Sequence, residues 1–266
     1  MQRLRVGTTE WAVHIQGQGA PLVLLHGLGG SHHDWDAQID FFARQRRVIA
    51  PDLRGFGQTP RGHGRLSVPI LAREVDLLCQ ALGISRCQVI GHSMGGAIAQ
   101  QWTLDHPQRI ESLVLANTLP SFRPRRVRHM AEFALRYAVM GALGPKRLAH
   151  ISARRNYPDP AQRQMAQHMI ARSAANSRRA YLSALRALSR WSVVERLPQL
   201  RLPVLICAAE HDYFEPQQIQ QFVAALPQAQ LHVFARAHHQ LPSEYADDFN
   251  RIVNAFLRSG AQQKAA

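Results

Sequence analysis

Residues 87–102 read CQVIGHSMGGAIAQQW, and this stretch decides the fold. Residues 87–91 form a short apolar run, which is typical of a strand buried on both faces. The run leads through residues 91–95 (GHSMG), which fit the pattern G-x-S-x-G, into residues 94–105, which have the pattern of a helix. A serine on such a tight turn is strained, and glycines beside it relieve the crowding. The stretch therefore predicts that Ser93 is a nucleophile at the end of a strand; the alternative is an ordinary loop serine.

Short apolar runs and helical patterns alternate on both sides of this stretch. Strands are expected at residues 21–26, 47–51, 111–116, 204–209 and 230–234, with edge strands at 3–5 and 9–15. Helices are expected at residues 35–44, 68–82, 216–225 and 245–257, and residues 259–266 are expected to fray. Strands separated by helices of about 10–15 residues predict an α/β fold, with a mostly parallel central sheet flanked by helices. Such sheets bind ligands at the carboxyl ends of their strands.

Residues 121–192 interrupt the alternation. They contain no strand pattern and four helical stretches, at residues 124–143, 145–155, 160–175 and 178–191, separated by proline and glycine. The interpretation is a core formed by residues 1–120 and 193–266, with residues 121–192 inserted as a helical cap.

Composition excludes several classes of protein. Apolar residues make up 46% and charged residues 19% of the 266, which is close to a globular average and excludes a disordered or collagen-like chain. No apolar run reaches the roughly 18 residues of a membrane span, and the N-terminus lacks the apolar region of a signal peptide. Three cysteines, an odd number, indicate reduced thiols. A cytoplasmic location is therefore expected.

The cap carries nearly all of the excess positive charge. The chain has 32 Lys and Arg against 18 Asp and Glu, a net charge of +14, and residues 121–192 hold 15 of the bases but only 2 of the acids. A positive surface over an active site attracts an anionic partner. The candidate anion-binding residues are Arg123, Arg125, Arg126, Arg128, Arg154, Arg155, Arg178 and Arg179. The alternative is a solvated helix face.

Three further segments supply the groups that a serine nucleophile needs. Residues 26–30 (HGLGG) follow a buried strand, and backbone N–H groups in such a turn can stabilise an oxyanion. Asp212 follows the strand at 204–209, with Glu210 and Glu215 as rival acids, and a histidine pair follows the strand at 230–234. The order Ser, Asp, His is the one that hydrolases with this type of turn require.

These segments together resemble the α/β-hydrolase superfamily over almost the full chain. The matching segments are LLHGLGG at 24–30, PDLRGFGQT at 51–59, GHSMGG at 91–96, AAEHDYFEP at 208–216 and AHHQLPSEYADDFN at 237–250. In the family the last segment usually reads Ala-Gly-His, four residues, then Glu. Counting back from Glu244 makes His239 the catalytic base and leaves His238 in place of the usual glycine.

The resemblance also implies roles for the remaining site residues. It places the oxyanion-binding N–H groups on Leu28 and Met94. The candidate substrate contacts are Gly27, His92, Trp35 and Leu241. The implied mechanism is attack by Ser93 on an acyl carbonyl, with His239 as base and Asp212 orienting it. It requires no metal and no organic cofactor.

The substrate is narrowed by what the motifs lack. A serine nucleophile argues against the epoxide hydrolases and haloalkane dehalogenases of the superfamily, and Gln240 stands where its carbon–carbon hydrolases usually have Trp. Carboxylic ester, lactone and thioester hydrolysis remain. The basic cap resembles the caps of the pimeloyl-carrier-protein methyl ester esterases, so the expected partner is an acyl-carrier protein or a small-molecule ester. A non-catalytic binding protein is the alternative of another class; nucleic acid and a membrane span are not expected.

Overall fold

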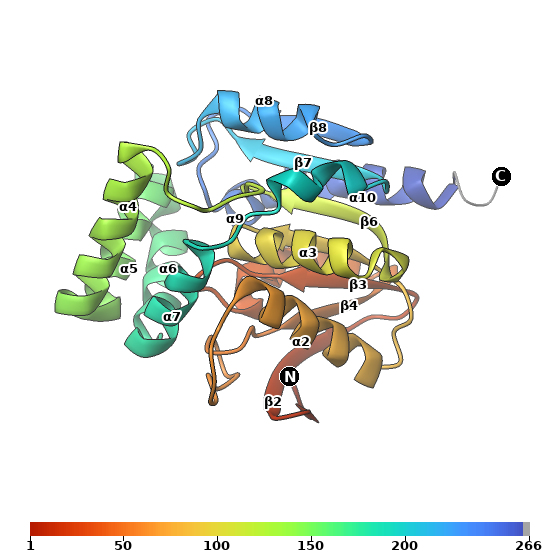
Figure 1. Ribbon diagram of the computed structural model, residues 1–266, viewed down its shortest axis with the longest axis horizontal. Helices are drawn as coiled ribbons and strands as arrows, with labels where there is room; N and C mark the ends of the chain where they lie inside the picture. The colour runs from red at the N-terminus through yellow and green to blue at the C-terminus, as the bar shows by residue number, and fades with distance from the viewer. Residues whose placement is uncertain (263–266) are drawn as a thin grey trace.

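The computed structural model describes residues 1–262 and contains one eight-stranded sheet (Figure 1). The strands lie in the order β1-β2-β4-β3-β5-β6-β7-β8. Their bounds are β1 Gln2–Val6, β2 Thr9–Gln16, β3 Ala20–Leu25, β4 Arg46–Pro51, β5 Cys87–His92, β6 Ile110–Ala116, β7 Val204–Ala209 and β8 Ala229–Phe234. At one edge of the sheet, β1 pairs antiparallel with β2, and β2 pairs antiparallel with β4. The other six strands, β4, β3, β5, β6, β7 and β8, are parallel to one another.

Helices cover both faces of the sheet because the central strands are apolar on both faces. In β3, Val23 and Leu25 belong to one core cluster, whereas Leu22 and Leu24 belong to the other. The first cluster is covered by α2 (Val68–Ala81), α3 (Met94–Asp105) and α8 (Pro216–Ala224); the second is covered by α1 (Asp36–Phe42), α9 (Leu241–Glu244) and α10 (Ala246–Gln262). Among residues 1–262, no helix has the length and apolar character needed to cross a bilayer.

The expected elements agree with the observed ones to within a few residues. The helix expected at residues 35–44 is shorter: a 3₁₀ turn, η1 (His32–Trp35), precedes α1, which ends at Phe42. Fraying from residue 259 is wrong for residues 259–262, which belong to α10, and the rest of that prediction lies outside the described residues. Two further 3₁₀ turns, η2 (Pro107–Arg109) and η5 (Val194–Gln199), flank β6 and β7.

The segment between β6 and β7 is helical and gathers beside one end of the sheet (Figure 1). It contains α4 (Val127–Ala138), a π-helical turn η3 (Val139–Leu143), α5 (Gly144–Asn156), η4 (Pro160–Gln162), α6 (Arg163–Ala174) and α7 (Arg178–Leu188). Residues 121–192 are all described and hold no strand beyond an isolated bridge between Ser121 and Ser192. The division into a core and a separate cap stays a prediction.

Candidate active site

Ser93 stands on a strained turn between β5 and α3. Its backbone has φ 52° and ψ −114°, a conformation that L side chains rarely adopt. Glycines make room for this turn: a Cβ on Gly95 would lie 2.0 Å from the Leu25 carbonyl oxygen, and one on Gly91 would lie 2.6 Å from the Gly95 oxygen. The turn therefore holds the serine side chain above the carboxyl end of the strand, as the motif predicts.

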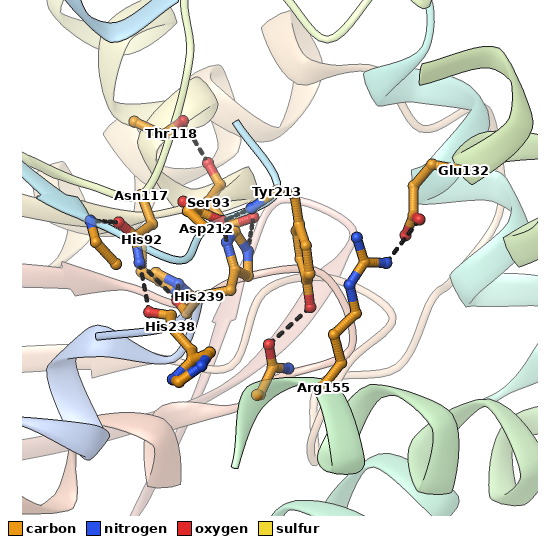
Figure 2. A network of polar contacts seen from close by, with 12 residues as sticks. His92, Ser93, Asn117, Thr118, Glu132, Arg155, Asp212, Tyr213, His238 and His239 are labelled. Atoms are coloured by element: carbon orange, nitrogen blue, oxygen red, sulfur yellow. Dashed lines mark hydrogen bonds and ion pairs between the residues drawn. The ribbon is translucent and has the colours of Figure 1, made fainter. Parts of the chain in front are cut away.

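Ser93, His239 and Asp212 form one chain of hydrogen bonds (Figure 2). The Ser93 Oγ lies 3.0 Å from His239 Nε2, and His239 Nδ1 lies 2.6 Å from Asp212 Oδ1. Since a carboxylate accepts only, Nδ1 carries the hydrogen and Nε2 is free to accept the serine proton. Ser93 follows β5, Asp212 follows β7 and His239 follows β8, so three strands of the parallel part of the sheet bring the three side chains together at its carboxyl end.

The two adjacent histidines have different partners, and only His239 lies within hydrogen-bond distance of both Ser93 and Asp212. His238 lies away from Ser93: its Nδ1 is 2.8 Å from Glu244 Oε1, and its backbone N–H donates to Glu244 Oε2 at 2.6 Å. The Glu244 side chain is only 1% exposed, so this pair ties the loop to the end of α9. The rival acids also face elsewhere. Glu210 accepts the Arg236 backbone N–H at 2.7 Å, and Glu215 pairs with Arg126.

Asn117 connects the loops that carry the acid and the base, and sequence reasoning missed it. Its Nδ2 donates to the carbonyl oxygens of His238 and His239 at 3.0 and 2.9 Å, and its Oδ1 accepts the Ala209 N–H at 2.8 Å. The residue follows β6 with φ 44° and is buried. The only sequence signal was its position directly after a strand. This signal is weak, because short polar residues are common at such positions in loops of every kind.

His92 supports the catalytic loop from below. Its Nε2 donates to the His239 carbonyl oxygen at 2.7 Å. Burial, helped by the neighbouring His239 ring, lowers the pKa of His92 to about 3, so the ring stays neutral. A Cβ on Gly27 would lie 3.0 Å from His92 Nδ1 and 3.3 Å from the Ser93 Cβ, which shows how closely the glycine-rich loop approaches the serine.

The two expected oxyanion donors come from the start of α3 and from the glycine-rich loop. Met94 is the first residue of α3, so its N–H belongs to the first turn, where backbone donors lack an intrahelical partner. Leu28 lies in the glycine-rich loop and lines the same cavity as Ser93 and His239. His26 anchors this loop: its Nε2 accepts the Leu53 N–H at 2.9 Å, and its Nδ1 donates to the Gly27 oxygen at 2.8 Å.

The four expected substrate contacts lie in different surroundings. Gly27 and His92 line the catalytic cavity. Trp35 and Leu241 are fully buried and are not among the described residues that line it, so the prediction of substrate contact is wrong for both. The physical reason is packing: both side chains belong to the core cluster under α1 and α10.

The eight cap arginines do not form one continuous set. Arg123, Arg128 and Arg155 line the cavity. Arg126 is paired with Glu215, and Arg178 donates to the Gly141 carbonyl at 2.8 Å. The remaining three, Arg125, Arg154 and Arg179, are exposed.

Tyr213 lies between His239 and the helical segment formed by residues 121–192, and sequence reasoning missed this residue too. Its ring is 4.4 Å from the His239 ring, centroid to centroid, and its hydroxyl donates to Asn156 Oδ1 at 2.7 Å. Burial raises the pKa of this phenol, which therefore stays protonated. Its position directly after Asp212 gave no signal, since the side chain's role depends on a cap residue 57 positions away.

The fold described above is that of a known protein family. A family model described as the alpha/beta hydrolase fold matches residues 20–246, and the chain belongs to this family. The sequence resemblance is thereby confirmed, and the chain is an α/β hydrolase. The likeness of its cap to those of pimeloyl-carrier-protein esterases stays a prediction.

Individual relatives within the family are hydrolases of several kinds. The chain is 31% identical over 259 residues to a putative carbamate hydrolase, RutD, of Variovorax paradoxus (strain S110), covering 93% of this chain and 95% of that one. It is 29% identical over 272 residues to a 2-hydroxy-6-oxo-6-phenylhexa-2,4-dienoate hydrolase of Burkholderia cepacia, covering 96% and 94%. The crystal structure of the enol-lactonase from Burkholderia xenovorans LB400 superimposes with a TM-score of 0.88 at 24% identity over 97% of this chain and all of that one, a likeness of fold.

Proposed function

We propose that this hydrolase cleaves carboxylic esters through a covalent acyl-enzyme on Ser93. The observation that carries the proposal is the chain of hydrogen bonds from Ser93 through His239 to Asp212, which opens into a cavity under the helical segment. A hydroxyl, a neutral imidazole and a buried carboxylate in this order are the parts that acyl transfer requires.

In the first half of the reaction, Ser93 Oγ bonds to the carbonyl carbon while its proton passes to His239 Nε2. Asp212 stabilises the imidazolium that forms. The N–H groups of Leu28 and Met94 stabilise the oxyanion, and each such donor is worth about 3 kcal/mol in the barrier. The tetrahedral intermediate then collapses, the carbon–oxygen bond to the alcohol breaks, and the alcohol takes the proton from His239.

In the second half, water replaces the alcohol. His239 takes a proton from the water as it attacks the acyl carbon, and the serine regains that proton when the acid leaves. Apolar side chains of the cap and core line the cavity beside this site, among them Phe133, Met140 and Leu185. They favour an acyl group with an apolar portion.

The test measures turnover and covalent labelling together. We expect the protein to hydrolyse p-nitrophenyl butyrate and to add one fluorophosphonate group at Ser93, found by peptide mass. The Ser93→Ala variant should lose the label and lower kcat by on the order of 10⁶-fold. Turnover near wild type in Ser93→Ala would contradict the proposal. A wild-type chain that neither turns over esters nor takes the label would support a non-catalytic binding protein.

A carrier-bound ester is a second candidate substrate, and one feature favours it. Three exposed arginines lie before and within the first turn of α4, namely Arg123, Arg125 and Arg128, and the first and last of them line the cavity. Val127, which lies beside them in the chain, is 83% exposed. A basic and apolar rim fits the acidic recognition helix of a carrier protein. Comparing kcat/KM for a carrier-linked methyl ester with that for the free methyl ester, at low and high salt, tests it. Equal, salt-insensitive rates would favour a small ester, and a parallel thioester and lactone panel separates the remaining alternatives.

A further inference from the structure

Two arginines of the helical segment reach the wall of the catalytic cavity. Arg136 comes from α4 and Arg155 from α5, and both line the cavity that contains Ser93 and His239. Their guanidinium carbons lie 5.5 and 4.2 Å from the centre of the Tyr213 ring. Figure 2 shows this ring between Arg155 and His239, so the positive charges lie one aromatic ring away from the catalytic imidazole.

A single carboxylate holds both guanidinium groups. Glu132 Oε1 accepts from Arg136 Nε, and Glu132 Oε2 accepts from Arg155 Nη1, both at 2.8 Å. Arg136 Nη1 donates in addition to the Tyr181 hydroxyl at 3.1 Å. One acid between two bases leaves one positive charge uncompensated and fixes the orientation of both planar groups. A guanidinium fixed in this way is preorganised to bind a carboxylate.

Donors remain available on both arginines. Within residues 1–262, Arg136 Nη2 and the Nε and Nη2 of Arg155 make no hydrogen bond to another residue, while other atoms of the same groups do. His129, which lines the same cavity, has a buried Nε2 without a hydrogen-bond partner in the described part of the chain. Buried polar atoms are rarely left unpaired in a folded protein, so the His129 nitrogen indicates a polar ligand. The open N–H groups of Arg136 and Arg155 belong to side chains that line the same cavity, and the Arg155 side chain is 43% exposed to solvent.

The charge of the whole cavity points in the same direction. Among the described residues that line it, four are arginines and two are acids. One of the acids is Glu132, which is already shared by two bases. The other is Asp34, and burial raises the pKa of its carboxyl, which disfavours the negative charge. A cleft lined by one sign of charge attracts ligands of the opposite sign.

We propose that Arg136 and Arg155 form a binding site for a carboxylate of the substrate, so that the preferred substrates are esters with an anionic group on the acyl chain. The preference for ester substrates rests on the proposed ester hydrolysis, whereas the binding of a carboxylate by the two arginines does not. The apolar lining between the two sites accommodates the linking chain, and Glu132 is a positioning residue that keeps the guanidinium groups apart from His239.

Binding is tested first, without turnover. The Ser93→Ala variant is titrated by calorimetry with monomethyl adipate, which is a monoanion at neutral pH, and with dimethyl adipate, which is neutral. We expect the monoester to bind at least about tenfold more tightly, the gain typical of a hydrogen bond between charged groups. The comparison is stringent because the diester carries an additional apolar methyl group, which by itself would favour the diester.

The second arm changes the site. In Ser93→Ala, adding Arg155→Gln should abolish most of the preference for the monoester, and Arg155→Lys should restore only part of it, since a lysine keeps the charge but loses the fork. Arg147→Gln is the matched control: this arginine is exposed on the same helix and is not among the described cavity residues. It should keep the full preference.

The third arm uses the Ser93 enzyme and compares kcat/KM for the same two esters. We expect Arg155→Gln to lower the value for the monoester at least about tenfold more than the value for the diester. An equal fall on both would show that Arg155 only holds Tyr213 over His239, and would overturn the inference. Equal binding of both esters by Ser93→Ala would overturn it as well. If no ester is hydrolysed but the monoester binds selectively, the proposed function fails and the anion site stands.

Discussion

Replacing Asn117 by alanine is expected to loosen the catalytic loop and destabilise the fold. The change removes three buried hydrogen bonds, to the carbonyl oxygens of His238 and His239 and from the Ala209 N–H. Each bond contributes about 1 kcal/mol net, and the partners left buried raise this cost. The Asn117 backbone has φ 44°, a left-handed conformation in which alanine costs about 1 kcal/mol more. The free energy of unfolding should therefore fall by about 4 kcal/mol.

Urea unfolding followed by circular dichroism measures the stability, and p-nitrophenyl butyrate turnover measures the site. Because both carbonyls belong to the loop that carries His239, a shift of the ring by about 1 Å should lower kcat by roughly 100-fold. Asn117→Gly separates the two contributions, since it loses the same bonds but tolerates the positive φ, and should recover about 1 kcal/mol.

Thr118→Val is the neighbouring control. It removes one hydrogen bond, from Thr118 Oγ1 to the Ser93 carbonyl at 2.8 Å, and should cost only about 1 kcal/mol. If Asn117→Ala cost no more than Thr118→Val and left kcat unchanged, the argument that this amide joins the acid and base loops would be refuted.

Three further predictions concern side chains described above. His238→Gly should keep kcat/KM within a few-fold of wild type, because its partner is Glu244, whereas His239→Ala should lose at least about 10³-fold on p-nitrophenyl butyrate; the reverse ranking would exchange the two roles. His92 is neutral in the folded protein, where its pKa is lowered from 6.5 to about 3, so the unfolded chain binds more protons than the folded one between these pH values. The free energy of unfolding should therefore fall by up to about 5 kcal/mol as the pH drops through this window. Urea titrations of His92→Gln over the same pH range should show a smaller fall. Cys207 is free and buried, and burial raises the pKa of its thiol, so iodoacetamide at pH 8 should alkylate it only after unfolding; rapid alkylation of the native protein, seen by mass, would contradict its burial.

Sequence periodicity located the sheet because its physics is local. Each central strand is a short run that is apolar on both faces, and α3 lies at 94–105 as expected. The helices of the inserted segment were found as a group, but the π-helical turn at Val139–Leu143 was not. A turn of this kind depends on how the end of α4 packs, and the residues 139–143 alone do not encode it.

For the candidate site, the motifs named Ser93, Asp212 and His239, each of which follows a strand, and the structure brings these three side chains together. The residues that sequence reasoning missed act across large separations. Asn117 contacts a loop more than 100 residues later, and Tyr213 meets Asn156 and Arg155 only when α5 is packed beside the end of the sheet. Trp35 was predicted to contact the substrate, yet its indole is packed in the core. Contacts of this kind require the tertiary structure.

The two ends of the inserted segment meet in a miniature ladder. Phe122 N donates to the Trp191 oxygen at 3.2 Å and Val193 N to the Pro120 oxygen at 2.8 Å, around the bridge between Ser121 and Ser192. The inserted segment, residues 121–192, therefore begins and ends at the same place beside the sheet. Because both ends of the insert lie side by side, a change in its length would leave the pairing between β6 and β7 in place.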